Sequence, residues 1–161
     1  SRGLGDVYKR QGKMKAWTEI FDPNYRFSLA KVSYQREQDI QDTAEIKVND
    51  NTDIHIEQDH AYLSLSREIK FQPDGLFSLL IEFDAELTYT ESYRAVIGES
   101  LDDEEKEKIK VLIQEQGLSV VMNLAARAST IIAELTLAAG FQPLIVPAVF
   151  SQKEDEQKDI Q

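Results

Sequence analysis

The chain has 161 residues, of which 42% are hydrophobic and 29% charged, and its formal net charge is −11. That length fits one domain. The acidity argues against binding to nucleic acid, which requires clustered Lys and Arg, and the absence of cysteine excludes disulfides, thiolate metal sites and a cysteine nucleophile.

The two ends of the chain are expected to lie outside the folded domain. Residues 1–13, beginning Ser-Arg-Gly-Leu, have no periodicity and are similar to translated adaptor sequence, so Met14 is the expected start of a domain over 14–150. Residues 151–161 are polar and acidic, which is typical of a disordered tail. Without a secretory signal or an uninterrupted apolar run of about 18 residues, we expect a cytoplasmic location and no membrane insertion.

The first half of the chain has the two-residue period of β-strands. Apolar side chains alternate from Tyr25 to Tyr34, with a phase slip near Ala30 that is typical of a bulge. The run Asn49-Asp50-Asn51 predicts a turn between short strands, and Gln58-Asp59 predicts another.

A hairpin between residues 63 and 89 is the clearest local prediction. Pro73-Asp74-Gly75 provides turn chemistry between two alternating strands. Their dry face carries Leu63, Leu65, Arg67, Ile69, Phe71, Leu79, Ile81, Phe83, Ala85, Leu87 and Tyr89. The return strand carries a row of acids, Glu82, Asp84 and Glu86, on its wet face.

Helical patterns begin after Ser100. Ser100 or Asp102 is expected to cap a helix that ends near Gly117, and a second helix should run from about Leu118 to Ala139 with Gly140 as its stop. The second helix is apolar over much more than the roughly 100° stripe of a surface helix, so we expect another subunit to cover part of it. The candidate interface residues are Val121, Leu124, Ala128, Ile131 and Leu135.

An apolar segment from Phe141 to Phe150 follows the long helix. It is predicted not to be helical because Pro143 and Pro147 interrupt it. It either packs at the edge of the sheet or forms part of a binding surface.

The order of these elements, together with Ala125-Ala126-Arg127, Gly140-Phe141, Pro143-Leu144 and the later Pro147 and Phe150, resembles SecB, the bacterial protein-export chaperone. The resemblance implies an α+β fold with a four-stranded antiparallel sheet packed against a long C-terminal helix. It also implies dimers that pair into a homotetramer.

The SecB resemblance further implies two binding sites. Unfolded polypeptide clients would contact Phe141, Pro143, Leu144, Ile145, Val146, Pro147 and Phe150. The translocase motor SecA would dock on Glu82, Asp84 and Glu86, for which the alternative is an ordinary solvated sheet face. The chain departs from SecB in lacking the typical second helix after the proline-containing segment and the Cys-Pro before the long helix.

Enzymatic chemistry is not predicted. The chain has no phosphate-binding glycine loop, nucleophile elbow or helical metal motif, and we expect no cofactor. His55, Glu57 and Asp59 share a strand face, but His60 points the other way, so a metal site is not expected. Arg127, inside an apolar helix, is expected to bind carbonyls or an acid across an interface. The predicted function is a chaperone for unfolded or precursor polypeptides linked to protein export, and the alternative is an adaptor for a specific partner such as a toxin–antitoxin system.

Overall fold

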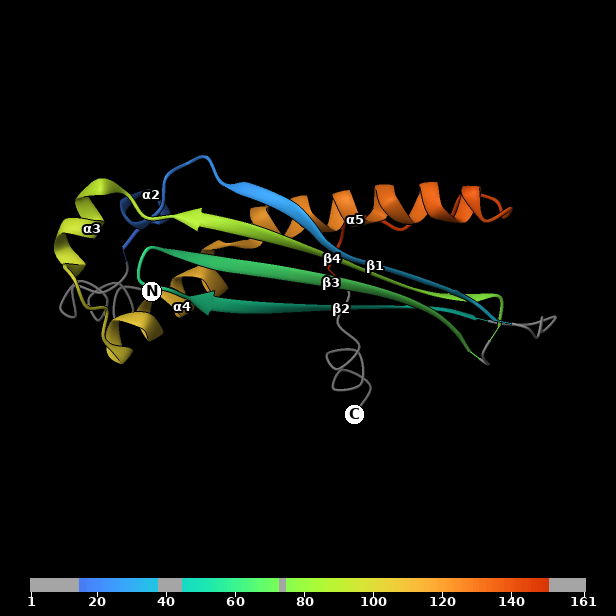
Figure 1. Ribbon diagram of the computed structural model, residues 1–161, viewed down its shortest axis with the longest axis horizontal. Coiled ribbons are helices and arrows are strands. Elements are labelled where there is room, and N and C mark those ends of the chain that lie inside the picture. The colour runs from blue at the N-terminus through green and yellow to red at the C-terminus, as the bar shows by residue number, and fades with distance from the viewer. Residues whose placement is uncertain (1–14, 38–44, 73–74, 151–161) are drawn as a thin grey trace, which may run out of the picture. The chain divides into compact units, whose positions relative to one another are not determined.

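The structure is a computed structural model that describes residues 15–37, 45–72 and 75–150 (Figure 1). The predicted leader over 1–13, the turn at 73–74 and the tail over 151–161 lie outside the described residues. The strands are β1 (Arg26–Arg36), β2 (Glu45–Ile56), β3 (His60–Gln72) and β4 (Phe77–Thr88). The helices are α2 (Trp17–Ile20), α3 (Glu91–Ile97), α4 (Asp103–Gln116) and α5 (Leu118–Ala138).

The four strands form one antiparallel sheet in the order β1-β4-β3-β2, so β1 and β2 are its edge strands. Together with the long C-terminal helix α5, this sheet confirms the predicted α+β class. The described residues divide into two compact units. Unit 1 contains residues 15–26, 54–62 and 86–118, and unit 2 contains residues 27–37, 45–53, 63–72, 75–85 and 119–150.

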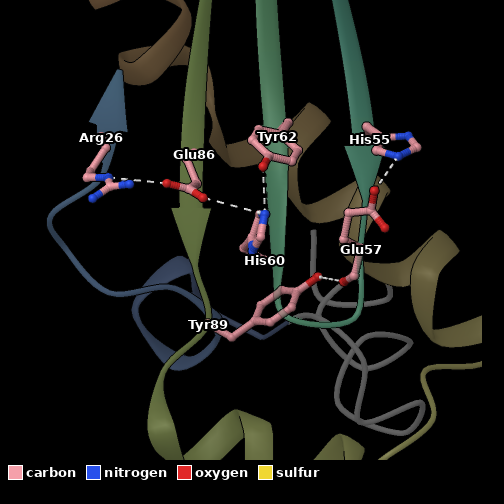
Figure 2. A network of polar contacts seen from close by, with 7 residues as sticks. All are labelled: Arg26, His55, Glu57, His60, Tyr62, Glu86 and Tyr89. Atoms are coloured by element: carbon pink, nitrogen blue, oxygen red, sulfur yellow. Dashed lines mark hydrogen bonds and ion pairs between the residues drawn. The ribbon is translucent and has the colours of Figure 1, made fainter. Parts of the chain in front are cut away.

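Unit 1 is held together by aromatic rings and their hydroxyl groups. The ring of Tyr89 lies 5.6 Å from those of both Phe21 and Tyr93, measured between centroids. The Tyr89 hydroxyl donates to the carbonyl of Glu57 at 2.8 Å, as Figure 2 shows, and the Tyr93 hydroxyl donates to Oε2 of Glu105 at 2.6 Å. These bonds tie the end of β4 and helix α3 to the β2–β3 connection and to α4.

Burial raises the pKa of both hydroxyls above the ordinary value of 10.0, and Glu57 adds to this for Tyr89, as Glu105 does for Tyr93. The folded chain therefore retains these protons more tightly than the unfolded chain. Their contribution to stability is complete well below the unfolded pKa of 10.0, and it is lost progressively as the pH rises from that value through the higher folded pKa.

We expect the free energy of unfolding to fall between pH 10 and pH 11.5, by at most about 1.4 kcal/mol per pH unit for each tyrosine. A Tyr89→Phe/Tyr93→Phe variant should show a shallower decline, measured by urea denaturation at a series of pH values. Equal slopes in the two proteins would contradict this assignment.

The core of unit 2 follows the predicted alternation of the hairpin. Leu79, Ile81 and Phe83 on β4 are buried, while the residues between them are half-exposed. Helix α5 contributes a row four residues apart, from Leu124 through Ala128 to Ile132. The alternation predicted for these two strands is thereby confirmed.

The helix boundaries also agree with their sequence signals. Asp102 is the N-cap of α4, because its side chain accepts a hydrogen bond of 2.8 Å from the backbone N–H of Glu105. Gly117 separates α4 from α5, and a Cβ there would lie 2.5 Å from the carbonyl oxygen of Ile113. Gly140, with φ of 97°, follows the end of α5.

The predicted turn at Asn49-Asp50-Asn51 is wrong. These residues lie inside β2, a continuous strand of 12 residues. The polar side chain of Asp50 is compatible with a strand because it is fully buried and paired with Arg67 of β3. A residue type that favours turns in isolation is therefore held in the sheet by a partner on the neighbouring strand.

Candidate functional site

The segment from Phe141 to Phe150, called the proline loop below, carries the most exposed apolar side chain of unit 2. Ile145 is 76% exposed and Val149 is 64% exposed. Further exposed apolar side chains of the same unit lie on α5 and on the edge strands: Met122, Leu137, Phe27, Leu29, Val32 and Ile46. Side chains of this kind can be buried by a binding partner.

The first half of the proline loop is attached to the end of α5 through Thr136. The backbone N–H of Phe141 donates to the Thr136 carbonyl at 3.0 Å. The buried Thr136 hydroxyl accepts a bond of 2.9 Å from the N–H of Leu144 and itself donates to the carbonyl of Ile132 at 2.9 Å. The Thr136 hydroxyl thus gives the N–H of Leu144 an acceptor in place of a backbone carbonyl, beyond the end of the helix.

The second half of the loop is attached to Arg67, which is fully buried on β3. Nη1 of Arg67 donates to the carbonyl of Pro147 at 2.7 Å, and Nη2 donates to the carbonyl of Val149 at 2.8 Å. Nη1 also donates to Oγ of Ser129 on α5 at 2.6 Å.

Asp50 balances the charge of Arg67. Nε and Nη2 of Arg67 donate to its two carboxylate oxygens at 2.8 and 2.7 Å, and both side chains are 0% exposed. Such a bidentate pair fixes the plane of the guanidinium group. Strands β2 and β3, helix α5 and the proline loop therefore meet at one buried ion pair.

Comparison with known proteins identifies the fold. A SecB-like chaperone from Mycobacterium tuberculosis, solved in complex with a ChAD peptide from the HigA1 antitoxin, matches this chain with a TM-score of 0.58. The match covers 91% of this chain and 96% of that chain, with 12% sequence identity.

This chain has a SecB-like fold. The resemblance stated from the sequence is confirmed at the level of the fold. No model of a protein family matches the chain, and no curated protein matches its sequence.

Within the SecB-like fold, the residues predicted to contact clients have different exposures. Ile145, Pro143 and Pro147 are exposed, whereas Phe141, Leu144 and Phe150 are half-buried. The ring of Phe141 packs 5.2 Å from that of Phe77, which is part of the core. Val146 is only 7% exposed, so it anchors the loop instead of presenting a binding surface. Val149, which was not among the predicted residues, faces outward.

The residues predicted at a subunit interface divide in the same way. Leu124 and Ala128 are fully buried within the chain itself, so their side chains are not accessible to another subunit. Val121, Ile131 and Leu135 are half-exposed. An oligomer interface on α5 stays a prediction that rests on these three residues.

Helix α5 is also long and apolar enough, by length and composition alone, to cross a membrane. The core helix of a soluble protein passes the same test. Here the hydrogen bond from Arg67 to Ser129 connects α5 to strand β3. From Ser119 onward the helix therefore belongs to unit 2.

Arg127 lies on the exposed side of α5, beside the edge strand β1. Its guanidinium carbon is 3.8 Å from the centroid of the Phe27 ring. This is the geometry of a cation–π contact, in which an exposed aromatic face is covered by a cation that remains in water. An acid or a carbonyl had been the expected partner.

The predicted acidic row lies on β4, where all three side chains are half-exposed. Asp84 of unit 2 accepts a hydrogen bond of 2.7 Å from Ser64. In unit 1, Figure 2 shows Glu86 between Arg26 and His60: Nε of Arg26 lies 3.3 Å away and Nε2 of His60 lies 3.5 Å away. Because Glu86 already has intrachain partners, a basic ligand would have to compete with them. Docking of SecA on Glu82, Asp84 and Glu86 stays a prediction.

Each of the two histidines has a neighbouring side chain within hydrogen-bonding distance. Nε2 of His55 is 2.8 Å from Oε1 of Glu57, and Nε2 of His60 is 2.7 Å from the hydroxyl of Tyr62 (Figure 2). Within residues 15–37, 45–72 and 75–150, no group of three or more potential metal ligands comes together.

The Asp50–Arg67 pair is the feature that sequence reasoning missed. The signal was Arg67 itself, because an arginine on the dry face of an alternating strand requires a buried acid. The sequence placed Arg67 on that face but did not indicate which acid would meet it.

Proposed function

We propose that this protein is a chaperone that binds exposed apolar segments of unfolded polypeptides. The observation that carries the proposal is the outward presentation of Ile145 and Val149 on a loop whose backbone is hydrogen-bonded to the core. Apolar side chains on an ordered backbone can bury client surface at little cost in loop entropy.

The SecB-like neighbour supports the proposal. That protein is a chaperone, and it was solved with a bound peptide. Binding in this manner requires apolar surface and accessible backbone but no reacting groups, so we propose binding in place of catalysis.

An adaptor for one specific partner is a second candidate that fits at least as well. It is favoured because the peptide bound to the neighbour comes from an antitoxin. By analogy with SecB, we extend the chaperone proposal to three further properties: a link to protein export, pairing of dimers into a tetramer through α5, and a cytoplasmic location.

We expect the purified protein to suppress aggregation of a chemically unfolded client when the two are mixed at an equal molar ratio of subunits. Light scattering after rapid dilution of the client from denaturant measures the effect. A folded acidic protein of similar size serves as the control for non-specific solubilisation.

The same assay separates the two candidates. Suppression with several unrelated clients is the chaperone result. Failure with all of them, combined with tight capture of one partner, would leave the adaptor function and reject the general chaperone.

A further inference from the structure

Within the described residues, the hydrogen bonds from Arg67 to the proline loop go to two main-chain carbonyls, those of Pro147 and Val149. We propose that Arg67 is a positioning residue for client binding, and that it sets the conformation in which the loop presents Ile145 and Val149. This inference rests on the proposed function.

The guanidinium group is saturated by its surroundings. Its five N–H groups have five acceptors: two oxygens of Asp50, Oγ of Ser129 and the two loop carbonyls. Asp50 occupies one edge of the planar group, so the N–H groups directed at the loop have a fixed orientation. A lysine has three donors on a flexible stem and cannot reproduce this fork.

The direction of the carbonyls determines what the loop exposes. The carbonyl of Val149 points inward to Arg67, and the Val149 side chain is 64% exposed. On the other side of Ile145, the N–H of Leu144 is bound to Thr136 and the side chain of Val146 is buried. Ile145 is thus held between two attachment points, and Arg67 provides the second.

Preorganisation of this kind raises affinity because the loop does not lose freedom when a client binds. Without Arg67, the carbonyls of Pro147 and Val149 would turn to water and the apolar side chains would sample many positions. Replacing the ion pair by apolar residues would then keep the fold and lose client binding.

The test is the double variant Asp50→Leu/Arg67→Met, which removes both charges together and leaves neither buried alone. We expect the circular dichroism spectrum to be retained. Thermolysin should cleave before Leu144 or Ile145 at least tenfold faster than in the unchanged protein. The affinity for a fluorescently labelled unfolded client should fall about tenfold.

Three further variants separate positioning from stability. Arg67→Lys keeps a cation beside Asp50 but lacks the fork, so cleavage should be accelerated and binding weakened. Ser129→Ala removes one acceptor of Arg67 and leaves both loop carbonyls bound, so it should resemble the unchanged protein. Ile109→Val trims a buried side chain of α4 in unit 1, which does not contain the loop, and should weaken stability without changing cleavage or client affinity.

The outcomes are distinguishable. If the unchanged protein binds no client, the proposed function fails, while the cleavage rates still report on whether Arg67 orders the loop. If the double variant is folded and either its cleavage rate or its client affinity is unchanged, the positioning role is overturned. If the double variant does not fold, Arg67→Lys decides: unchanged cleavage or unchanged client binding overturns the role, and faster cleavage with weaker binding supports it.

Discussion

Replacing Arg67 alone by Met is expected to lower the free energy of unfolding by about 3–5 kcal/mol, the range observed when one member of a buried ion pair is removed. The carboxylate of Asp50 is fully buried and would lose the cation to which it is bound through both oxygens. Since a domain has only about 5–15 kcal/mol of total stability, this single change should bring the protein close to unfolding at ambient temperature.

Urea denaturation followed by circular dichroism measures this loss. The matched control is Arg26→Met, the same substitution at an ion pair whose arginine side chain is 88% exposed and lies 3.3 Å from Glu86. An exposed pair contributes about 0–1 kcal/mol, so the control should be nearly neutral. Similar losses for the two variants would show that burial of the Asp50–Arg67 pair does not increase its effect on the free energy of unfolding.

The largest functional effect is expected from Ile145→Asp/Val149→Asp, which places two charges on the exposed side of the proline loop. Client affinity should fall at least tenfold, which corresponds to about 1.4 kcal/mol. Burial of one such apolar side chain contributes about 1.5–3 kcal/mol, and a charge at the contact would add a desolvation cost. Stability should change little because both side chains are already in water.

Fluorescence anisotropy of a labelled unfolded client measures the affinity. Val96→Asp is the control, because Val96 is an equally exposed apolar residue on α3, at 69%, and is not part of the proline loop. It adds one negative charge without altering the proposed contact. Equal weakening by the control would mean that overall charge, and not the loop surface, governs client binding.

Local signals in the sequence were sufficient for much of the fold. The alternation of β3 and β4 predicts their buried face because the side-chain period of a strand is two. Asp102 and Gly117 mark the ends of α4 through a side-chain cap and a close approach to the Ile113 carbonyl. Each of these signals acts within a few residues of the position it determines.

Features that depend on distant partners were not predictable in this way. Asp50 lies in a strand because it meets Arg67, 17 residues later. Helix α3 has only seven residues, too few to show a period, and its N-cap Thr90 lies only two residues after the end of β4 at Thr88. The prolines identified the loop after α5, but the inward direction of Val146 and the outward direction of Val149 depend on Arg67, Thr136 and the core.

The buried pair also constrains how this sequence can change over evolutionary time. Because either charge alone is unfavourable in the interior, a substitution at Asp50 or Arg67 should persist only when the other position changes as well. Homologues should therefore carry either both charges or two apolar residues at these positions. In the second group, lineages that still bind clients should have acquired another donor for the loop carbonyls, and the location of that donor would reveal an independent solution to the same geometric requirement.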